Sequence, residues 1–137
     1  MRYELTHPQL LAALGRAGHG SLVLVADSNY AVSTGASASA ERVHLNLRPG
    51  LLSTDQVLEV LLGAIPVEAA ASMVGPDGED SPAVAGFAAA LDVPLERVQR
   101  EPFRAAARSA DCAVVIATGD TRHYANVLLT IGALPGT

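Results

Sequence analysis

The chain has 137 residues, of which half are hydrophobic and only 4% are aromatic, so its core must consist mainly of alanine, valine and leucine. A chain of this length is typical of one domain, and we expect a single domain over residues 1–137. The formal net charge of −5 provides no basic surface for a phosphate backbone, so we expect no nucleic-acid partner.

The first residues, MRYELTHPQ, lack the apolar stretch of a secretory signal, and no apolar run in the sequence is long enough to span a bilayer. We therefore expect a soluble, cytoplasmic protein that does not bind membranes. Thr6 and Pro8 predict the start of a helix, since threonine can cap free amides and proline suits the first turn. The apolar face of this helix consists of Leu10, Leu11, Leu14 and Ala17.

Residues 18–30, with the sequence GHGSLVLVADSNY, combine a histidine and a carboxylate. His19 lies between two glycines, the apolar run 22–26 predicts a buried strand, and Asp27 follows that run directly. The imidazole and the carboxylate should therefore lie at opposite ends of one strand. The same residues are also typical of a helix stop followed by an ordinary turn.

The middle of the chain alternates predicted strands and helices. The small residues 33–40 predict a mobile surface loop, and the alternation of apolar and polar residues over 43–47 predicts a second strand. Ser53 and Gln56 predict a capping box for a helix that Pro66 ends. The remaining predicted elements are a strand at 67–74, an exposed turn at 75–81, a helix at 83–91, a strand at 97–100 and a helix at 102–110.

The clearest predicted strand is the run CAVVIA at residues 112–117. Its Cys112 is the only cysteine, which excludes an intrachain disulfide and fits a reducing compartment, and we interpret it as a small buried residue. The alternation of strands and helices predicts an α/β fold of three layers, in which a mainly parallel sheet is flanked by helices on both faces.

The sequence contains no motif for a nucleotide cofactor or a serine nucleophile. It has no glycine-rich dinucleotide fingerprint, P-loop or serine elbow. The four histidines share no metal-ligand spacing and the cysteine has no partner, so we expect no metal site. The remaining polar groups suit proton transfer and hydrogen bonding to hydroxyls, and they are His19, Asp27, Asn29, Arg100, His123, Tyr124 and Asn126.

Several of these groups follow the last predicted strand. Residues 118–121 predict a turn, and Tyr124 and Asn126 would point to the same side if the backbone between them is extended. A phenol and an amide would then face one ligand. In the alternative interpretation, Tyr124 packs with its hydroxyl at the surface and Asn126 satisfies a nearby backbone group.

The pairing of GHG-x-LVLVADSNY with EPFRAAARSADCAVVIATGDTRHYANVLLTIG resembles the family of D-ribose pyranase and L-fucose mutarotase, and the resemblance extends over nearly all of the chain. It implies an isomerase that interconverts the cyclic forms of a free monosaccharide without a cofactor or a metal. It also implies ring-shaped homo-oligomers, pentamers or decamers, with sites near subunit interfaces. The sequence combines features of the ribose and fucose branches, so it does not identify the sugar.

The resemblance further implies roles for individual residues. His19 corresponds to the proton donor, Asp27 to a sugar-binding carboxylate, and Arg100 to a substrate contact, while the Tyr124 hydroxyl is a candidate for relaying a second proton. The closing motif that binds the substrate consists of Tyr124, Ala125 and Asn126. Two other hypotheses remain open: a non-catalytic sugar-binding or regulatory module on the same fold, and a protein that serves only in assembly.

Overall fold

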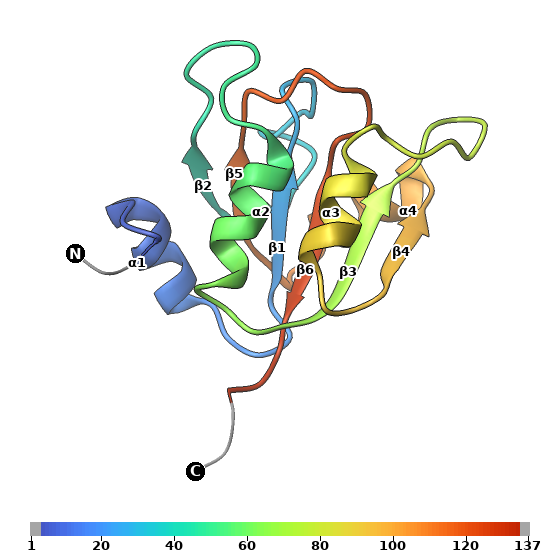
Figure 1. Ribbon diagram of the computed structural model, residues 1–137. Helices are drawn as coiled ribbons and strands as arrows, with labels where there is room; N and C mark the ends of the chain where they lie inside the picture. The colour runs from blue at the N-terminus through green and yellow to red at the C-terminus, as the bar shows by residue number, and fades with distance from the viewer. Residues whose placement is uncertain (1–3, 135–137) are drawn as a thin grey trace.

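The apolar run after Ser21 forms the central strand β1 (Leu22–Ala26), and its last four residues are fully buried. A strand that is covered on both faces needs such a continuous apolar run. In the computed structural model, which describes residues 4–134, five further strands join β1 in one sheet (Figure 1). They are β2 (Glu41–His44), β3 (Val67–Met73), β4 (Leu95–Val98), β5 (Cys112–Ala117) and β6 (Val127–Ile131).

The strand order across the sheet is β2-β5-β1-β6-β3-β4. Strand β5 pairs in parallel with β1 and β2, and β3 pairs in parallel with β4. Strand β6 runs antiparallel between β1 and β3. The predicted mainly parallel sheet is therefore confirmed, with one reversed strand near its centre that the sequence analysis did not predict.

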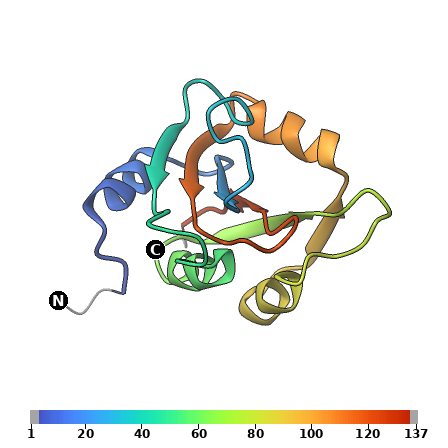
Figure 2. The same cartoon turned by 90° about the horizontal axis from the view of Figure 1, so that it is seen from above.

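Four helices cover the two faces of the sheet (Figure 2). They are α1 (Pro8–Arg16), α2 (Thr54–Leu62), α3 (Val84–Ala90) and α4 (Arg100–Arg108). The first three bury apolar side chains such as Leu58 and Phe87 on one face, whereas α4 buries Phe103 on the other. The predicted three layers are thus confirmed. None of the helices between residues 4 and 134 has the length and apolar character needed to cross a bilayer.

The helix starts follow local capping chemistry. The predicted capping box of α2 is confirmed, because the Ser53 hydroxyl accepts the Gln56 amide at 3.3 Å and the Gln56 side chain accepts the Ser53 amide at 3.0 Å. Helix α1 is capped by His7 instead of the predicted Thr6, since the Nδ1 atom of His7 accepts the amide of Leu10 at 3.1 Å. Both caps satisfy amides that the first helical turn leaves free.

Three predicted element boundaries, the ends of β2 and β4 and the start of α4, are wrong. Strand β2 ends at His44 instead of continuing to residue 47, and the Leu47 side chain is 84% exposed, so the apolar alternation there does not mark a strand. Strand β4 ends at Val98 and helix α4 begins at Arg100, two residues before the predicted start. Pro102 fits within the first turn of α4, where its missing N–H costs no hydrogen bond.

The loop over residues 31–40 is held in place by Arg42, which differs from the predicted mobile loop. The guanidinium of Arg42 donates to the backbone carbonyls of Val32, Ser33, Ala36, Ser37 and Ala40. The amide of Ser37 also donates to the carbonyl of Ala107 in α4 at 2.9 Å. The loop thus packs beside α4 on the same face of the sheet.

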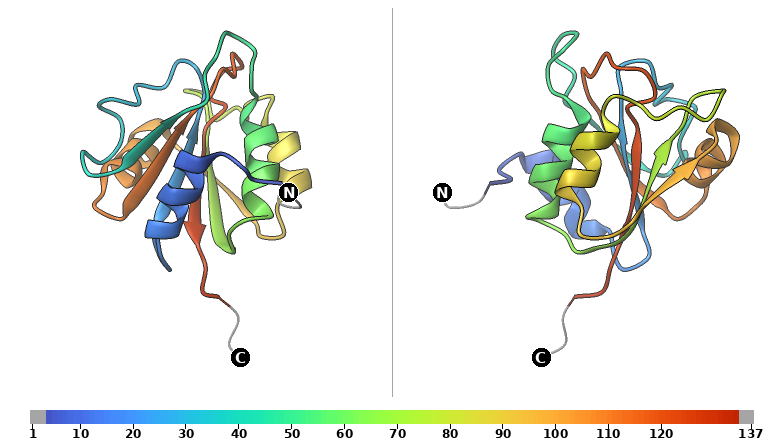
Figure 3. Two further views of the ribbon diagram at one scale, coloured as in Figure 1. Left: turned by 90° about the vertical axis from the view of Figure 1, so that its left-hand side faces the viewer. Right: turned by 45° about the vertical axis from the view of Figure 1, so that its right-hand side comes forward.

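The loops that follow β1, β3 and β5 gather at one end of the sheet, and β6 runs from this end to the opposite one (Figure 3). Gly119 lies in the loop after β5 and packs against the turn at residues 48–51, where its carbonyl accepts the amide of Gly50 at 2.7 Å. A Cβ at residue 119 would collide with the backbone carbonyls of Leu51 and Arg48. Only glycine therefore allows these two loops to approach so closely.

We expect Gly119→Ala to lower the free energy of unfolding by about 2 kcal/mol or more, because overpacking against backbone typically costs about 1–3 kcal/mol. Urea denaturation followed by circular dichroism would measure the change. The matched control is Gly15→Ala in α1, where a Cβ meets open space. Alanine should stabilise that helix by up to about 1 kcal/mol. Wild-type stability in Gly119→Ala would contradict the packing described here.

Candidate active site

Asp27 joins the end of β1 to the start of β6. Its side chain is 5% exposed, and its Oδ1 and Oδ2 atoms accept the amides of Asn29 at 3.0 Å and Ala125 at 3.2 Å. In return, the Asp27 amide donates to the Oδ1 atom of Asn126 at 2.7 Å. These bonds satisfy the buried polar groups and fix the carboxylate relative to the backbone of both segments.

Burial raises the pKa of Asp27, although the amides of Asn29, Tyr30 and Ala125 act in the opposite direction. Burial disfavours the charged form of a carboxyl group, while hydrogen bonds to the carboxylate favour it. Asp27 therefore keeps its proton to a higher pH than an exposed aspartate. A carboxyl group of this kind is typical of ligand-binding and catalytic sites.

Tyr124 has a φ of 57°, which lies in the left-handed region that bulky residues rarely adopt. It is the only non-glycine residue between positions 4 and 134 with a positive φ. The condition under which Tyr124 and Asn126 would point to the same side, an extended backbone between them, is therefore not met at Tyr124. The left-handed turn presents the Ala125 amide to Asp27, and a hydrogen bond of 2.8 Å from the Asn126 amide to the Tyr124 carbonyl closes the turn. Strain of this kind costs about 1–3 kcal/mol and requires support from the surroundings.

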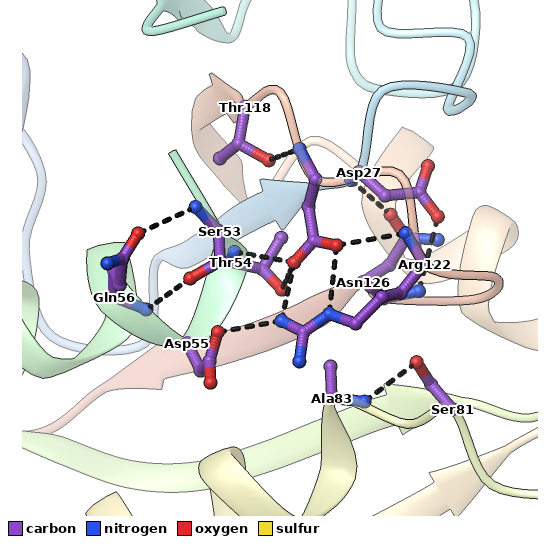
Figure 4. Close-up of polar contacts among 12 residues, drawn as sticks. Asp27, Ser53, Thr54, Asp55, Gln56, Ser81, Ala83, Thr118, Arg122 and Asn126 are labelled. Atoms are coloured by element: carbon purple, nitrogen blue, oxygen red, sulfur yellow. Dashed lines mark hydrogen bonds and ion pairs between the residues drawn. The ribbon is translucent and has the colours of Figure 1, made fainter. Parts of the chain in front are cut away.

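The bond from the Ala125 amide to Asp27 provides part of that support, and the segment just before the turn is held by the Asp120 clamp, which we define as Asp120, Arg122, Thr54 and Asp55 (Figure 4). Asp120 is 3% exposed, and its Oδ2 atom accepts the amide of Thr54 at 2.9 Å and the hydroxyl of Thr54 at 3.0 Å. The Arg122 guanidinium donates to both carboxylate oxygens of Asp120, at 3.0 and 2.6 Å, and to Asp55 at 2.7 Å. The clamp ties residues 120–122 to the first turn of α2.

Burial alone would raise the pKa of Asp120, but hydrogen bonds from Arg122 and Thr54 lower it to about 2. Burial likewise acts to raise the pKa of Asp55, but hydrogen bonds with Ser53 and Arg122 hold it below its ordinary value. Because the pKa of Asp120 in the folded state lies below its ordinary value, the pair stabilises the fold above about pH 4. This stabilisation is lost as the pH falls towards 2.

A pocket of about 550 Å³ opens beside Asp27. It lies at the carboxyl ends of β1 and β3, where open α/β sheets usually bind ligands. Its apolar lining includes Met73 and Val74. The polar side chains that line it are Asp27, Asn29, Tyr30, Gln99, Arg100, Glu101, Arg104, His123, Tyr124 and Asn126. Arg100 and Arg104 belong to the first turns of α4, so the pocket has one cationic wall.

His19 lies at the other end of β1, and this confirms the predicted separation of imidazole and carboxylate. The side chain is 58% exposed, and its Nε2 atom lies 3.1 Å from the Oε1 atom of Glu68. The five residues of β1, roughly 15 Å of strand, separate His19 from Asp27. Within one chain, His19 therefore does not line the pocket.

The other six polar candidates of the sequence lie together in one pocket, and they are Asp27, Asn29, Arg100, His123, Tyr124 and Asn126. Ala125 is fully buried and contributes its backbone amide to Asp27. The sequence analysis missed Arg104 and the Asp120 clamp. Arg104 is one helical turn from Arg100, a spacing that could have indicated a shared face. The residues of the clamp are too far apart in the sequence to form a local pattern.

Within residues 4–134, no three histidine, cysteine, aspartate or glutamate side chains come together as a metal site. The pocket thus offers hydrogen-bond donors, acceptors and proton-exchanging groups, but not a metal-ligand set, in the part of the chain that the structure describes. Such a site can hold a small, hydroxyl-rich molecule and move protons on it.

Comparison with known proteins agrees with this description. A model of the RbsD / FucU transport protein family matches residues 1–134. The D-ribose pyranase of Paracidovorax citrulli is 30% identical over 131 residues, which cover 96% of each chain. Bacillus subtilis RbsD, solved in complex with D-ribose, has a TM-score of 0.83 and 22% identity, with coverage of 98% of this chain and 99% of that one. The fucose mutarotase of Streptococcus pneumoniae, solved with L-fucose, has a TM-score of 0.78 and 23% identity over 94% of both chains.

We expect Arg122→Gln to lower the free energy of unfolding by about 2 kcal/mol, because it leaves the buried Asp120 carboxylate without its charged partner. Denaturant unfolding at neutral pH would measure this loss. The matched control is Arg97→Gln, since Arg97 pairs with Asp80 where both side chains are almost half exposed. Exposed pairs contribute about 0–1 kcal/mol. Equal losses in the two variants would contradict a stabilising role for the clamp.

Proposed function

Because the chain belongs to the RbsD / FucU transport protein family, we propose that it is an isomerase that interconverts the cyclic forms of a free monosaccharide. The observation that carries the proposal is the buried Asp27 beside Asn126 in a polar pocket at the carboxyl ends of the strands. The relatives support it, since one is a D-ribose pyranase and one similar fold is a fucose mutarotase. The substrate we propose is a pentose or deoxyhexose such as D-ribose or L-fucose.

The reaction opens and recloses a hemiacetal ring. The anomeric hydroxyl gives up its proton, a carbonyl forms at the anomeric carbon, and the bond from that carbon to the ring oxygen breaks as this oxygen takes up a proton. Reclosure on the other face of the carbonyl, or through another hydroxyl, reverses these steps. No electrons leave the sugar and no group is transferred, so positioned proton donors and acceptors suffice.

The residues of the pocket divide between binding and proton transfer in this proposal. Each carboxylate oxygen of Asp27 can accept a further hydrogen bond besides the one from the backbone, so Asp27 can hold a sugar hydroxyl. The Asn126 side chain lies beside it, and Arg100, which lines the same pocket, can donate to hydroxyls. The Tyr124 hydroxyl is proposed to position or relay a proton. Fixing the ring in this way lowers the entropic cost of the reaction.

His19 can act as a proton donor in this pocket only if a second copy of the chain supplies it. His19 is exposed and lies at the opposite end of β1 from Asp27, so it cannot reach the pocket of its own chain. We therefore place the site at an interface of a ring-shaped homo-oligomer, a pentamer or decamer, in which His19 of one copy faces the pocket of the next. The single buried Cys112 fits a cytoplasmic location.

We expect the wild-type protein to accelerate exchange between the cyclic forms of one sugar in a panel of ribose, fucose, galactose and glucose, without an added cofactor. Saturation-transfer NMR measures this exchange. His19→Ala should reduce the acceleration at least tenfold, since positioned acid–base groups contribute about 10²–10⁴ in rate. Asp27→Asn should also reduce it at least tenfold, because it removes the carboxylate that we propose to position the sugar. The control Asp92→Asn changes an exposed aspartate outside the pocket and should retain wild-type exchange.

Thermal melting with each sugar separates the proposal from the binding module. A sugar that binds only the folded state raises the melting temperature whether or not it reacts. Stabilisation without faster exchange would contradict the isomerase and support a sugar-binding or regulatory module. If no sugar changes either melting or exchange, both proposals fail.

A further inference from the structure

Ring opening needs two proton transfers at two different oxygens of the sugar. One group must take the proton of the anomeric hydroxyl, and another must deliver a proton to the ring oxygen. On reclosure the two groups exchange roles, so each must both accept and donate. This inference rests on the proposed function, and it asks which side chain of this chain's own pocket meets that requirement.

Most polar groups of the pocket do not meet it. Arginine keeps its proton at any physiological pH and amides do not exchange one. Burial raises the pKa of Tyr30 to about 12, and its hydroxyl already donates to the carbonyl of Gly35. Asp27 accepts two backbone amides, and we assign its remaining hydrogen-bonding capacity to binding a sugar hydroxyl and not to carrying a proton.

His123 has the required chemistry and lines the same pocket as Asp27 and Tyr124. Histidine is the side chain that most readily takes up and releases protons near neutral pH, and its two ring nitrogens can act in turn. A tyrosine phenol, by contrast, keeps its proton at neutral pH unless it is strongly perturbed. Among the pocket residues that the structure describes, His123 carries the only imidazole.

The backbone around His123 is fixed although its side chain is exposed. Arg122, the preceding residue, is tied to Asp120 and Asp55, and Tyr124, the following residue, holds its left-handed conformation. The rings of His123 and Tyr124 lie with their centroids 5.9 Å apart at an angle of 43°. The imidazole and the phenol thus lie side by side in the lining of the pocket, to which α4 contributes Arg100 and Arg104.

We propose that His123 is a catalytic residue that performs one of the two proton transfers of ring opening and closure from within its own chain. The other transfer falls to the group that the oligomer brings to the pocket, for which His19 of a neighbouring copy is the candidate. Tyr124 then orients the imidazole or the sugar. The assignment explains why the pocket retains an acid–base group even though His19 lies at the far end of β1.

The test compares His123→Ala and His123→Gln with the wild type, by sugar-exchange NMR over a range of concentrations of the sugar that the wild type turns over. We expect kcat to fall on the order of 10²-fold, the usual contribution of a general acid or base, with KM and the melting temperature near wild-type values. Added imidazole should restore part of the exchange in His123→Ala, which a purely structural role would not allow. The matched control is His44→Gln, an exposed histidine at the end of β2 that does not line the pocket.

Wild-type kcat in both His123 variants would overturn the assignment while leaving the proposed function intact. A rise in KM without a loss of kcat, and without rescue by imidazole, would also overturn it, because it would identify His123 as a binding residue only. If the wild type itself does not accelerate exchange, the proposed function fails first and the role of His123 fails with it. The wild-type measurement therefore distinguishes the two failures.

Discussion

The reciprocal contact between Asp27 and residues 125–126 determines the shape of the candidate site. Strand β6 runs antiparallel beside β1, with Val127 opposite Val25, so the residues just before β6 necessarily lie over the end of β1. The Asp27 carboxylate accepts the amide of Ala125, and the Asn126 side chain accepts the amide of Asp27. Both side chains line the pocket at this contact. Without the reversed strand, these two residues, 99 positions apart in the sequence, would not meet.

The pKa values of two buried aspartates in this region shift in opposite directions because their partners differ. Asp27 accepts only neutral amides, so burial dominates and its pKa rises. Asp120 faces the Arg122 guanidinium, and this charge outweighs burial and holds its pKa at about 2. The Asp120 clamp, ionised above its low pKa, therefore holds residues 120–122 just before the turn at Tyr124, while the carboxyl group of Asp27, which is easier to protonate, lines the pocket. The Asp120 clamp thus stabilises the fold around the site, whereas Asp27 is the carboxyl group proposed to bind the sugar.

Much of the fold could be predicted because its signals are local. The runs that became β1 and β5 are continuous and apolar, and the capping box at Ser53 requires only residues within one turn. The predicted site residues at Asp27, Tyr124 and Asn126 likewise came from short motifs, and the structure places them together. The spacing of Tyr124 and Asn126 left open whether they bind a ligand or have structural roles, and the resemblance to a sugar-isomerase family favoured ligand binding.

What could not be predicted depends on contacts between distant segments. The direction of β6 is set by its pairing with β1 and β3, and nothing in the run of residues 127–131 encodes it. The guanidinium of Arg42 anchors the loop over residues 31–40 by donating to its backbone carbonyls. Every residue has such a carbonyl, so the loop sequence does not indicate these bonds. The left-handed Tyr124 contradicts its own backbone preference, and only the surrounding contacts stabilise it. The position of His19 relative to a pocket depends in addition on a second copy of the chain.

A crystal structure of the protein grown with the sugar that it turns over would test the central claim most directly. The account predicts the sugar in the pocket of about 550 Å³, with one hydroxyl bonded to the Asp27 carboxylate and its ring between His123 and the arginines at the start of α4. It also predicts His19 of a neighbouring copy at the mouth of that pocket. A sugar bound elsewhere, with the Asp27 pocket holding only solvent, would contradict the account.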